Sequence, residues 1–170
     1  MVSKYTVIKD TREQDGWFFS PYDKCEGMEI GTLHTGDYTL RGFEEVVCIE
    51  RKASVSEIAM NLGRKKEAFQ KEMERMKDFP FSFIVCEFDM DDVLKYPEGS
   101  NVPQKARSQV RVTGKYLLKC LMEFQIWYDT KIILCGNKNN AFLVCNSIFK
   151  RLNELFVGDS NDKRDGRPTF

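Results

Sequence analysis

An apolar segment that ends in three charged residues constrains the fold of this chain more than any other feature. Val46–Ile49 is a strand-like run, and Glu50, Arg51 and Lys52 follow it directly. Because side chains alternate along a strand, Glu50 and Lys52 are expected on one face and Arg51 on the other. Charged groups at the rim of a buried strand are costly unless something compensates them. The sequence therefore predicts a buried strand whose end carries a functional site.

Further acids follow two other predicted strand ends. Asp37 stands in Gly36-Asp37-Tyr38, and the first strand-like run of the chain ends near Asp10 and Glu13. Phosphodiester hydrolysis needs carboxylates to hold a divalent ion, which lowers the pKa of a bound water. It also needs a cation to orient that water or to share the developing charge. The residues thus indicate a metal-nuclease site, although an isolated Glu-x-Lys is more often a solvated strand end.

Taken in order, these motifs resemble the XPF/Hef-type (ERCC-type) nuclease domains, a branch of the PD-(D/E)XK restriction-like superfamily. The family pattern is Asp-x-Arg-Glu, then Gly-Asp-Tyr, then Glu-Arg-Lys-x-x-x-Asp, and the resemblance covers roughly residues 5–156. It implies a catalytic site and a metal site that share acids. The catalytic residues would be Lys52, Glu50, Asp37, Glu13 and Arg51, and the metal ligands Asp37, Glu50, Asp10 and Glu13. Oxygen ligands favour Mg²⁺ or Mn²⁺ over zinc as the cofactor.

One departure from the family pattern bears on activity. Ser56 stands where the family has the last Asp, and Glu57 is next to it. Glu57 is a candidate substitute, but Ser54-x-x-Glu57 is a capping-box pattern, and we favour capping. Two alternatives to a structure-specific endonuclease therefore stay open. One is a catalytically weakened DNA-binding or scaffold module of the same fold, and the other is a PD-(D/E)XK nuclease without branch preference.

The order of predicted elements indicates an α/β fold with a restriction-endonuclease-like core, a central mixed sheet flanked by helices. We expect one nuclease domain over residues 1–157 and a disordered tail over residues 158–170. Strands are expected near residues 5–11, 28–33 with a continuation over 37–40, 45–51, 81–88 and 131–135. Helices are expected as one long segment from Ser54 to Pro80, then over 113–128 and 140–156.

The resemblance implies that DNA is the partner and that the enzyme cuts flaps, forks or other branched DNA in repair or recombination. The formal net charge is zero, so positive charge must be segregated to meet a polyanion. Basic runs on helices are usually solvated faces, and Thr113–Gly114 reads as a helix start that would interrupt a continuous basic stripe. The candidate DNA contacts are Arg12, Arg64, Arg107, Arg111 and Lys115.

Many relatives add a helix-hairpin-helix module, for which this chain has no room, so branch selectivity would need a partner, a dimer or loops such as 97–111. Relatives also dimerise through the last strand and helices. Phe142, Phe149 and Phe156 recur every seven residues, as an interface or a core-facing stripe would. We expect a homodimer through the C-terminal helices. The aromatic residues Trp17–Phe19 and Trp127–Tyr128 are expected to pack rather than to stack on bases.

The cysteines and the hydropathy point to an intracellular protein. The six cysteines include no Cys-x-x-Cys pair and mostly lie in apolar segments, which predicts buried free thiols in a reducing compartment. No apolar span is long enough to predict a membrane partner. The compartment would be the cytoplasm of a prokaryote or an infected host, or the nucleus of a eukaryote.

Overall fold

The structure is a computed structural model that describes residues 4–157. Its centre is a six-stranded mixed sheet in the order β2-β1-β3-β4-β5-β6. The pairs β1–β2, β4–β5 and β5–β6 are parallel, whereas β3 is antiparallel to both β1 and β4. The strands are β1 (Tyr5–Asp10), β2 (Cys25–Gly31), β3 (Tyr38–Leu40), β4 (Val47–Lys52), β5 (Phe81–Cys86) and β6 (Lys131–Leu134).

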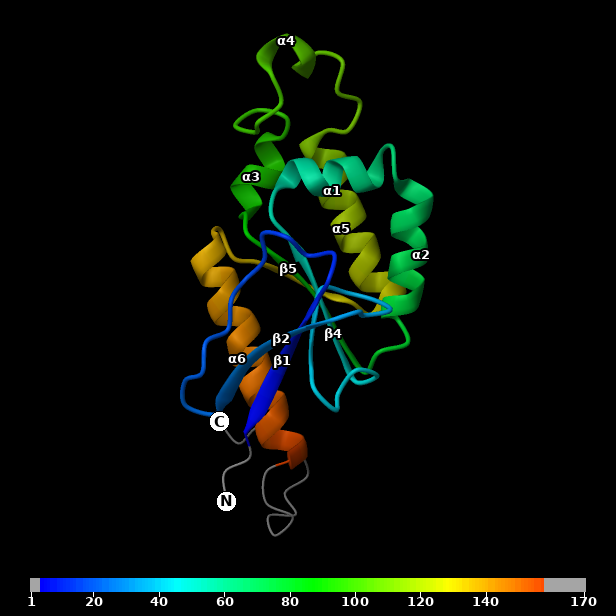
Figure 1. The fold of residues 1–170 in the computed structure, drawn as a ribbon. Coiled ribbons are helices and arrows are strands. Elements are labelled where there is room, and N and C mark those ends of the chain that lie inside the picture. Colours follow the sequence, from blue (N-terminus) through cyan, green and yellow to red (C-terminus); the bar gives the residue numbers. More distant parts are fainter. Residues whose placement is uncertain (1–3, 158–170) are drawn as a thin grey trace, which may run out of the picture.

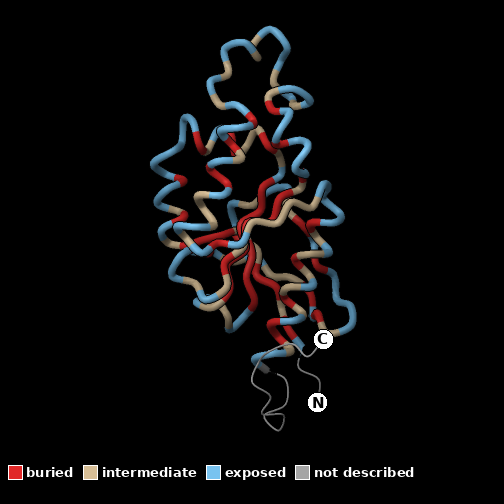
Figure 2. Tube along the Cα trace, turned by 180° about the vertical axis from the view of Figure 1, so that it is seen from behind, coloured by how far each residue is buried: buried red, intermediate tan, exposed pale blue. Residues whose placement is uncertain are grey.

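Helices cover both faces of the sheet (Figure 1). They are α1 (Val55–Leu62), α2 (Lys66–Met76), α3 (Met90–Lys95), α4 (Gln104–Arg107), α5 (Gly114–Tyr128) and α6 (Lys138–Val157). One face packs against α1, α2 and α5, and the other packs against α6 and the segment that follows β1. Buried residues concentrate along the central strands and the helix sides that face them (Figure 2). The predicted α/β fold with a mixed sheet between helices is confirmed.

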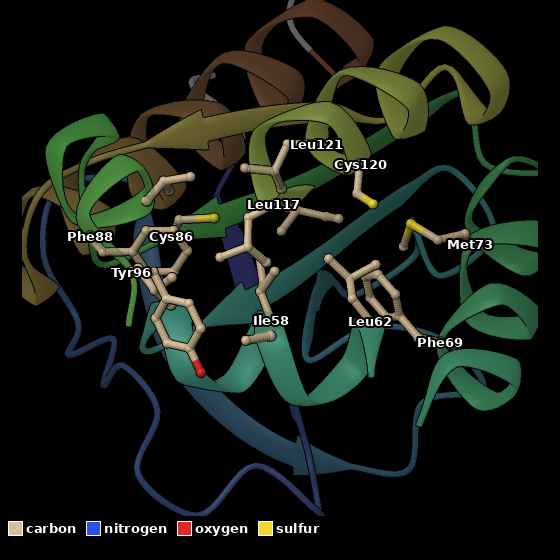
Figure 3. Close-up of a cluster of buried hydrophobic side chains, with 14 of the residues drawn as sticks. Ile58, Leu62, Phe69, Met73, Cys86, Phe88, Tyr96, Leu117, Cys120 and Leu121 are labelled. Carbon is tan, nitrogen blue, oxygen red and sulfur yellow. The ribbon is translucent and has the colours of Figure 1, made fainter. Parts of the chain in front are cut away.

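The first core layer joins α1, α2 and α5 to β4 and β5 (Figure 3). Ile58, Met73 and Leu117 are among its fully buried side chains. Burial of each such side chain contributes about 1.5–3 kcal/mol. This layer fixes α2 beside the end of β4, which is where the charged residues stand.

The second core layer holds α6 against β1, β3 and the loop after β1. Trp17 and Phe19 are each 2% exposed and pack in this layer, as predicted, whereas Phe18 is 72% exposed, so the packing prediction is wrong there. Phe142 and Phe149 turn toward Phe19, with ring centroids 5.0 and 6.0 Å away. These two phenylalanines therefore face the core of their own chain.

The segment predicted as one helix after Ser54 is two helices, so that prediction is wrong. The chain leaves helical geometry at Gly63, whose ψ is −93°, and α2 starts again at Lys66. Glycine has a low helix propensity, and the break lets both helices pack on α5. Arg64 was expected on a helix, but it lies in the turn between α1 and α2.

The prediction that the second strand continues into residues 37–40 is also wrong. β2 and β3 lie on opposite sides of β1, and the chain crosses between them through residues 32–37. The carboxylate of Asp10 accepts the N–H of Leu33, and the Arg12 guanidinium donates to the Leu33 carbonyl, at 2.7 and 2.9 Å. These contacts hold the crossover in place. The short helices α3 and α4 were not predicted.

The cysteines, Trp127 and the hydropathy of the helices test the remaining expectations. All six cysteines are free, and five of them are buried. Trp127 is 71% exposed, so its predicted packing is wrong. None of the helices within residues 4–157 combines the length and apolarity needed to cross a membrane. The predicted tail over residues 158–170 lies outside the described residues.

Candidate active site

The site lies where the start of β3 meets the end of β4. The N–H of Asp37 donates to the carbonyl of Ile49 over 2.8 Å, and the N–H of Arg51 donates to Oδ2 of Asp37, also over 2.8 Å. Tyr38 is paired with Ile49 in the antiparallel register. Asp37 is thereby fixed opposite Glu50 and Arg51, although it lies 13 positions before Glu50 in the sequence.

Glu50 and Lys52 share one face of β4, as strand alternation predicts. Nζ of Lys52 lies 2.6 Å from Oε1 of Glu50, and the two residues are 3% and 6% exposed. Nζ of Lys52 also lies 3.4 Å from Oε1 of Glu57 and 5.4 Å from the ring centroid of Phe69. The lysine is therefore held rigidly beside the acid with which it was predicted to act.

Burial and like charge perturb the two acids strongly. Burial raises the pKa of Asp37 to about 7, and the Glu13 carboxylate contributes, against the N–H of Arg51 and the charge of Lys52. Burial also raises the pKa of Glu50 well above its ordinary value, with Asp37 adding to the effect and Lys52 opposing it. Paired acids that resist ionisation are typical of sites built to hold a cation or move a proton.

Arg51 points to the opposite face of β4, where it is held by acids. Its Nε and Nη2 donate to the two oxygens of Glu87 over 2.7 and 3.0 Å, and Nη1 lies 3.2 Å from Oε1 of Glu13. Nε1 of Trp17 donates to Glu87 over 2.8 Å, and the guanidinium carbon is 5.9 Å from the Trp17 ring. This bidentate, nearly buried pair and the Trp17 contact tie the loop after β1 to β4.

Asp10 and Arg12 form a separate network at the end of β1. Oδ1 of Asp10 accepts from Nε and the backbone N of Arg12 over 2.6 and 2.9 Å. Burial opposes the shift, but hydrogen bonds from Arg12 and Leu33 lower the pKa of Asp10. The N–H of Asp10 donates to the carbonyl of Asp37 over 2.8 Å, which brings this strand end beside the site. The role of Asp10 as a metal ligand stays a prediction.

The helix start after β4 carries the Ser54 half of the predicted capping box, whereas Glu57 accepts from Ala53 and not from the N–H of Ser54. Oγ of Ser54 accepts the N–H of Glu57 over 3.3 Å. Oε2 of Glu57 accepts the N–H of Ala53 over 2.9 Å, while Oε1 faces Lys52. Glu57 thus binds the backbone just before the helix and also contacts Lys52 of the site. Ser56 donates to Oδ1 of Asn101 over 2.8 Å.

The donor set fits a hard divalent cation. Lys52 forms ion pairs with both Glu50 and Glu57. Asp37 accepts only a backbone N–H from Arg51, and the negative charge of Glu13 acts on it. When Asp37 and Glu50 are ionised, the site therefore has excess negative charge, which a cation with oxygen ligands would relieve. Asp37 and Glu50 are the acids best placed to hold it. Within residues 4–157, no three His, Cys, Asp or Glu side chains converge closely enough to form a closed metal cluster.

The predicted DNA contacts do not gather in one place. Arg107 pairs with Glu98 and donates to the Val102 carbonyl, in the segment around α4 that projects beyond α1 and α3 (Figure 1). Arg111 and Lys115 are exposed on either side of the start of α5, and the helix break between Arg107 and Lys115 that Thr113 predicted is present. Arg12 is exposed and lies nearest the acids.

Two acids near the site were not identified as site residues from the sequence. Glu87 follows β5, and its pairing with Arg51 depends on the β4–β5 register. Glu72 lies on α2, where it reads as one of several glutamates that dilute a basic run. The signal for Glu87 was the position of an acid directly after a buried strand, the same signal that marks Glu50.

The mixed sheet between helices is a restriction-endonuclease-like α/β fold. Two solved structures, XPF from Aeropyrum pernix and the same protein in complex with DNA, share the fold with a TM-score of 0.59 each. They are 20% and 19% identical to this chain, covering 91% and 92% of it, while the chain covers 67% and 69% of theirs. Identities this low show the fold alone.

The ERCC4 domain model matches residues 10–147. The chain therefore belongs to the ERCC4 domain family, and the predicted XPF/Hef-type resemblance is confirmed. The matched segment begins at Asp10 and includes Asp37, which precedes β3, and Glu50 of β4. A comparison with curated protein sequences finds no significant match.

Proposed function

We propose that this protein is a divalent-metal-dependent DNA endonuclease that hydrolyses phosphodiester bonds. The observation that carries the proposal is the buried Glu50–Lys52 pair, 2.6 Å apart, beside Asp37, which directly precedes the neighbouring strand β3. Replacing a buried ion pair with apolar residues is often neutral or stabilising. Stability alone therefore does not explain this pair, which supports a functional role. Membership of the ERCC4 domain family supports a nuclease acting on DNA.

Asp37 and Glu50 would hold Mg²⁺ or Mn²⁺, with Glu13 and Asp10 as outer acids. A divalent ion held there would polarise the scissile phosphate and lower the pKa of the attacking water. Lys52 would donate a hydrogen bond to that water or to a phosphate oxygen, because neighbouring acids keep it protonated. Arg51 would position the site, since its backbone N–H holds Asp37.

We propose branched DNA, such as flaps and forks, as the substrate, in repair or recombination. The support is the family and the DNA complex of XPF from Aeropyrum pernix, a protein with the same fold. Arg12, Arg64, Arg107, Arg111 and Lys115 are exposed or partly exposed, as phosphate contacts must be. The free buried thiols fit an intracellular setting.

Homodimerisation through the C-terminal helices is part of the proposal. An open apolar groove of about 540 Å³ lies between β5 and α6, lined by residues that include Phe83, Leu143 and Ile148. Phe156 is 55% exposed next to this region, although its ring also contacts Phe43 and Phe81. A second copy of the chain would cover this surface. Sedimentation equilibrium of the wild type and Leu143→Asp tests it.

The function is tested by cleavage assays on labelled flap, fork, duplex and single-stranded DNA, with Mg²⁺, with Mn²⁺ and with EDTA. Lys52→Ala and the near-isosteric Lys52→Met are compared with Lys131→Ala, an exposed lysine at the start of β6. We expect metal-dependent cleavage that falls by about 100-fold or more in both Lys52 variants and persists in the control. Circular dichroism confirms that the variants fold.

The same assay separates the alternatives. Ser56 is engaged with Asn101 and supplies no acid to the site, which is the observation that favours a weakened DNA-binding or scaffold module. Binding of branched DNA without cleavage in either metal would support that module and contradict the enzyme. Equal cleavage of all substrates would leave a nuclease without branch preference.

A further inference from the structure

A glutamate on α2 faces the acidic site. Glu72 is partly buried in the middle of this helix. Residues three positions apart lie on the same side of a helix, so Phe69, Glu72 and Arg75 form one row along α2. Met73 and Met76, beside this row, are fully buried and fix the rotation of the helix against the core.

Both neighbours of Glu72 in the row touch the structural elements that carry the site. The Phe69 ring centroid lies 5.4 Å from Nζ of Lys52. At the other end of the row, Nε of Arg75 donates to Oγ1 of Thr35 over 3.2 Å, in the loop that leads into β3. Glu72 stands between these two contacts. It therefore faces the space between the end of β4 and the start of β3.

The electrostatics agree with this placement. Burial is the largest cause that raises the pKa of both Asp37 and Glu50, and the Glu72 carboxylate adds to it in each case. A charge that acts on both acids must lie near both. Within residues 4–157 the Glu72 side chain has no hydrogen-bond donor and no ion-pair partner. Its carboxylate is thus not fixed in an ion pair, although the positive charges of Arg12 and Lys52 both lie within its electrostatic reach.

We propose that Glu72 is a third acid of the metal site and binds the hydrated cation through water from the α2 side. The inference rests on the proposed metal-dependent function. Because the described acids do not form a closed cluster, a contact through water suits the geometry better than direct ligation. Mg²⁺ keeps several of its waters in protein sites, and an outer carboxylate accepts hydrogen bonds from them. Glu72 would also supply an acid to a site in which Ser56 supplies none.

Calorimetric titration of the whole chain with Mn²⁺ tests the inference without relying on activity. Glu72→Gln keeps the side-chain shape and removes the charge. Glu74→Gln is the matched control, because Glu74 is exposed on the same helix. We expect Glu72→Gln to weaken Mn²⁺ binding by about tenfold or more, the range seen when an outer partner is lost. Glu74→Gln should bind Mn²⁺ like the wild type.

A stability measurement separates a functional role from a structural one. In EDTA, Glu72→Gln should unfold at the same or a higher urea concentration than the wild type, because one of several like charges is gone. A loss of stability in EDTA would show that Glu72 supports the fold and would overturn the inference. Unchanged Mn²⁺ affinity in Glu72→Gln would overturn it while the proposed function stands. A wild type that does not bind Mn²⁺ would overturn both.

Discussion

Neutralising Asp37 should make the metal-free protein more stable, even though it removes a residue of the site. Asp37→Asn keeps the side-chain shape, and its amide oxygen can still accept the N–H of Arg51. What disappears is a negative charge that burial and neighbouring carboxylates disfavour. A loss of function combined with a gain of stability is expected where a site is strained for a ligand.

The magnitude follows from the shifted pKa, which moves from 3.8 to about 7 in the folded protein. Each tenfold change in proton affinity is worth about 1.4 kcal/mol, so ionised Asp37 costs the folded state up to about 4 kcal/mol above pH 7. Because the folded state binds this proton more tightly, wild-type stability should fall as pH rises from about 4 to 7 and level off above. The gain from Asp37→Asn is then largest at pH 8 and vanishes near pH 4.

Urea unfolding in EDTA at pH 8 and pH 4.5, followed by circular dichroism, measures this difference. Asp15→Asn, an exposed acid in the loop after β1, is the control and should change nothing. With Mn²⁺ at 100 times its dissociation constant, the wild type should gain about 2.7 kcal/mol and Asp37→Asn much less. If Asp37→Asn proves less stable than the wild type at pH 8 in EDTA, the reasoning about excess negative charge is refuted.

Two further substitutions test the supports of the site. Gly36→Ala should cost about 1–3 kcal/mol in urea unfolding and lower cleavage, because φ is +78° and a Cβ would stand 2.5 Å from Sγ of Cys48. Wild-type stability in this variant would contradict the need for glycine at this position. Glu87→Gln should cost about 3–5 kcal/mol, since it leaves Arg51 buried with a weaker partner. Urea unfolding of Glu87→Gln against the exposed-site control Glu67→Gln measures this, and equal stability would refute it.

The sequence predicted that Asp37, Glu50 and Lys52 lie together, and this placement depends largely on local rules. Alternation along β4 places Glu50 and Lys52 together and sends Arg51 to the other face. An acid before a short strand and an acid at the end of the next strand meet when the two strands are antiparallel neighbours, as β3 and β4 are. No long-range information was needed beyond that pairing.

The missed features depend on contacts between distant segments. Glu87 reaches Arg51 because β5 pairs in parallel with β4, a register that no local pattern specifies. Glu72 faces the site because the chain breaks at Gly63 and α2 takes a new direction. A continuous helical pattern over Ser54–Pro80 concealed that break, since apolar spacing survives a short interruption.

The side chain and the backbone N–H of Arg51 bind different parts of the molecule. The guanidinium anchors the loop around Trp17 through Glu87, whereas the N–H fixes Asp37 from the same residue. A displacement of that loop would therefore reach Asp37, the residue before β3, by way of a single peptide unit. Arg51 thereby joins the loop around Trp17 to the acid that precedes β3.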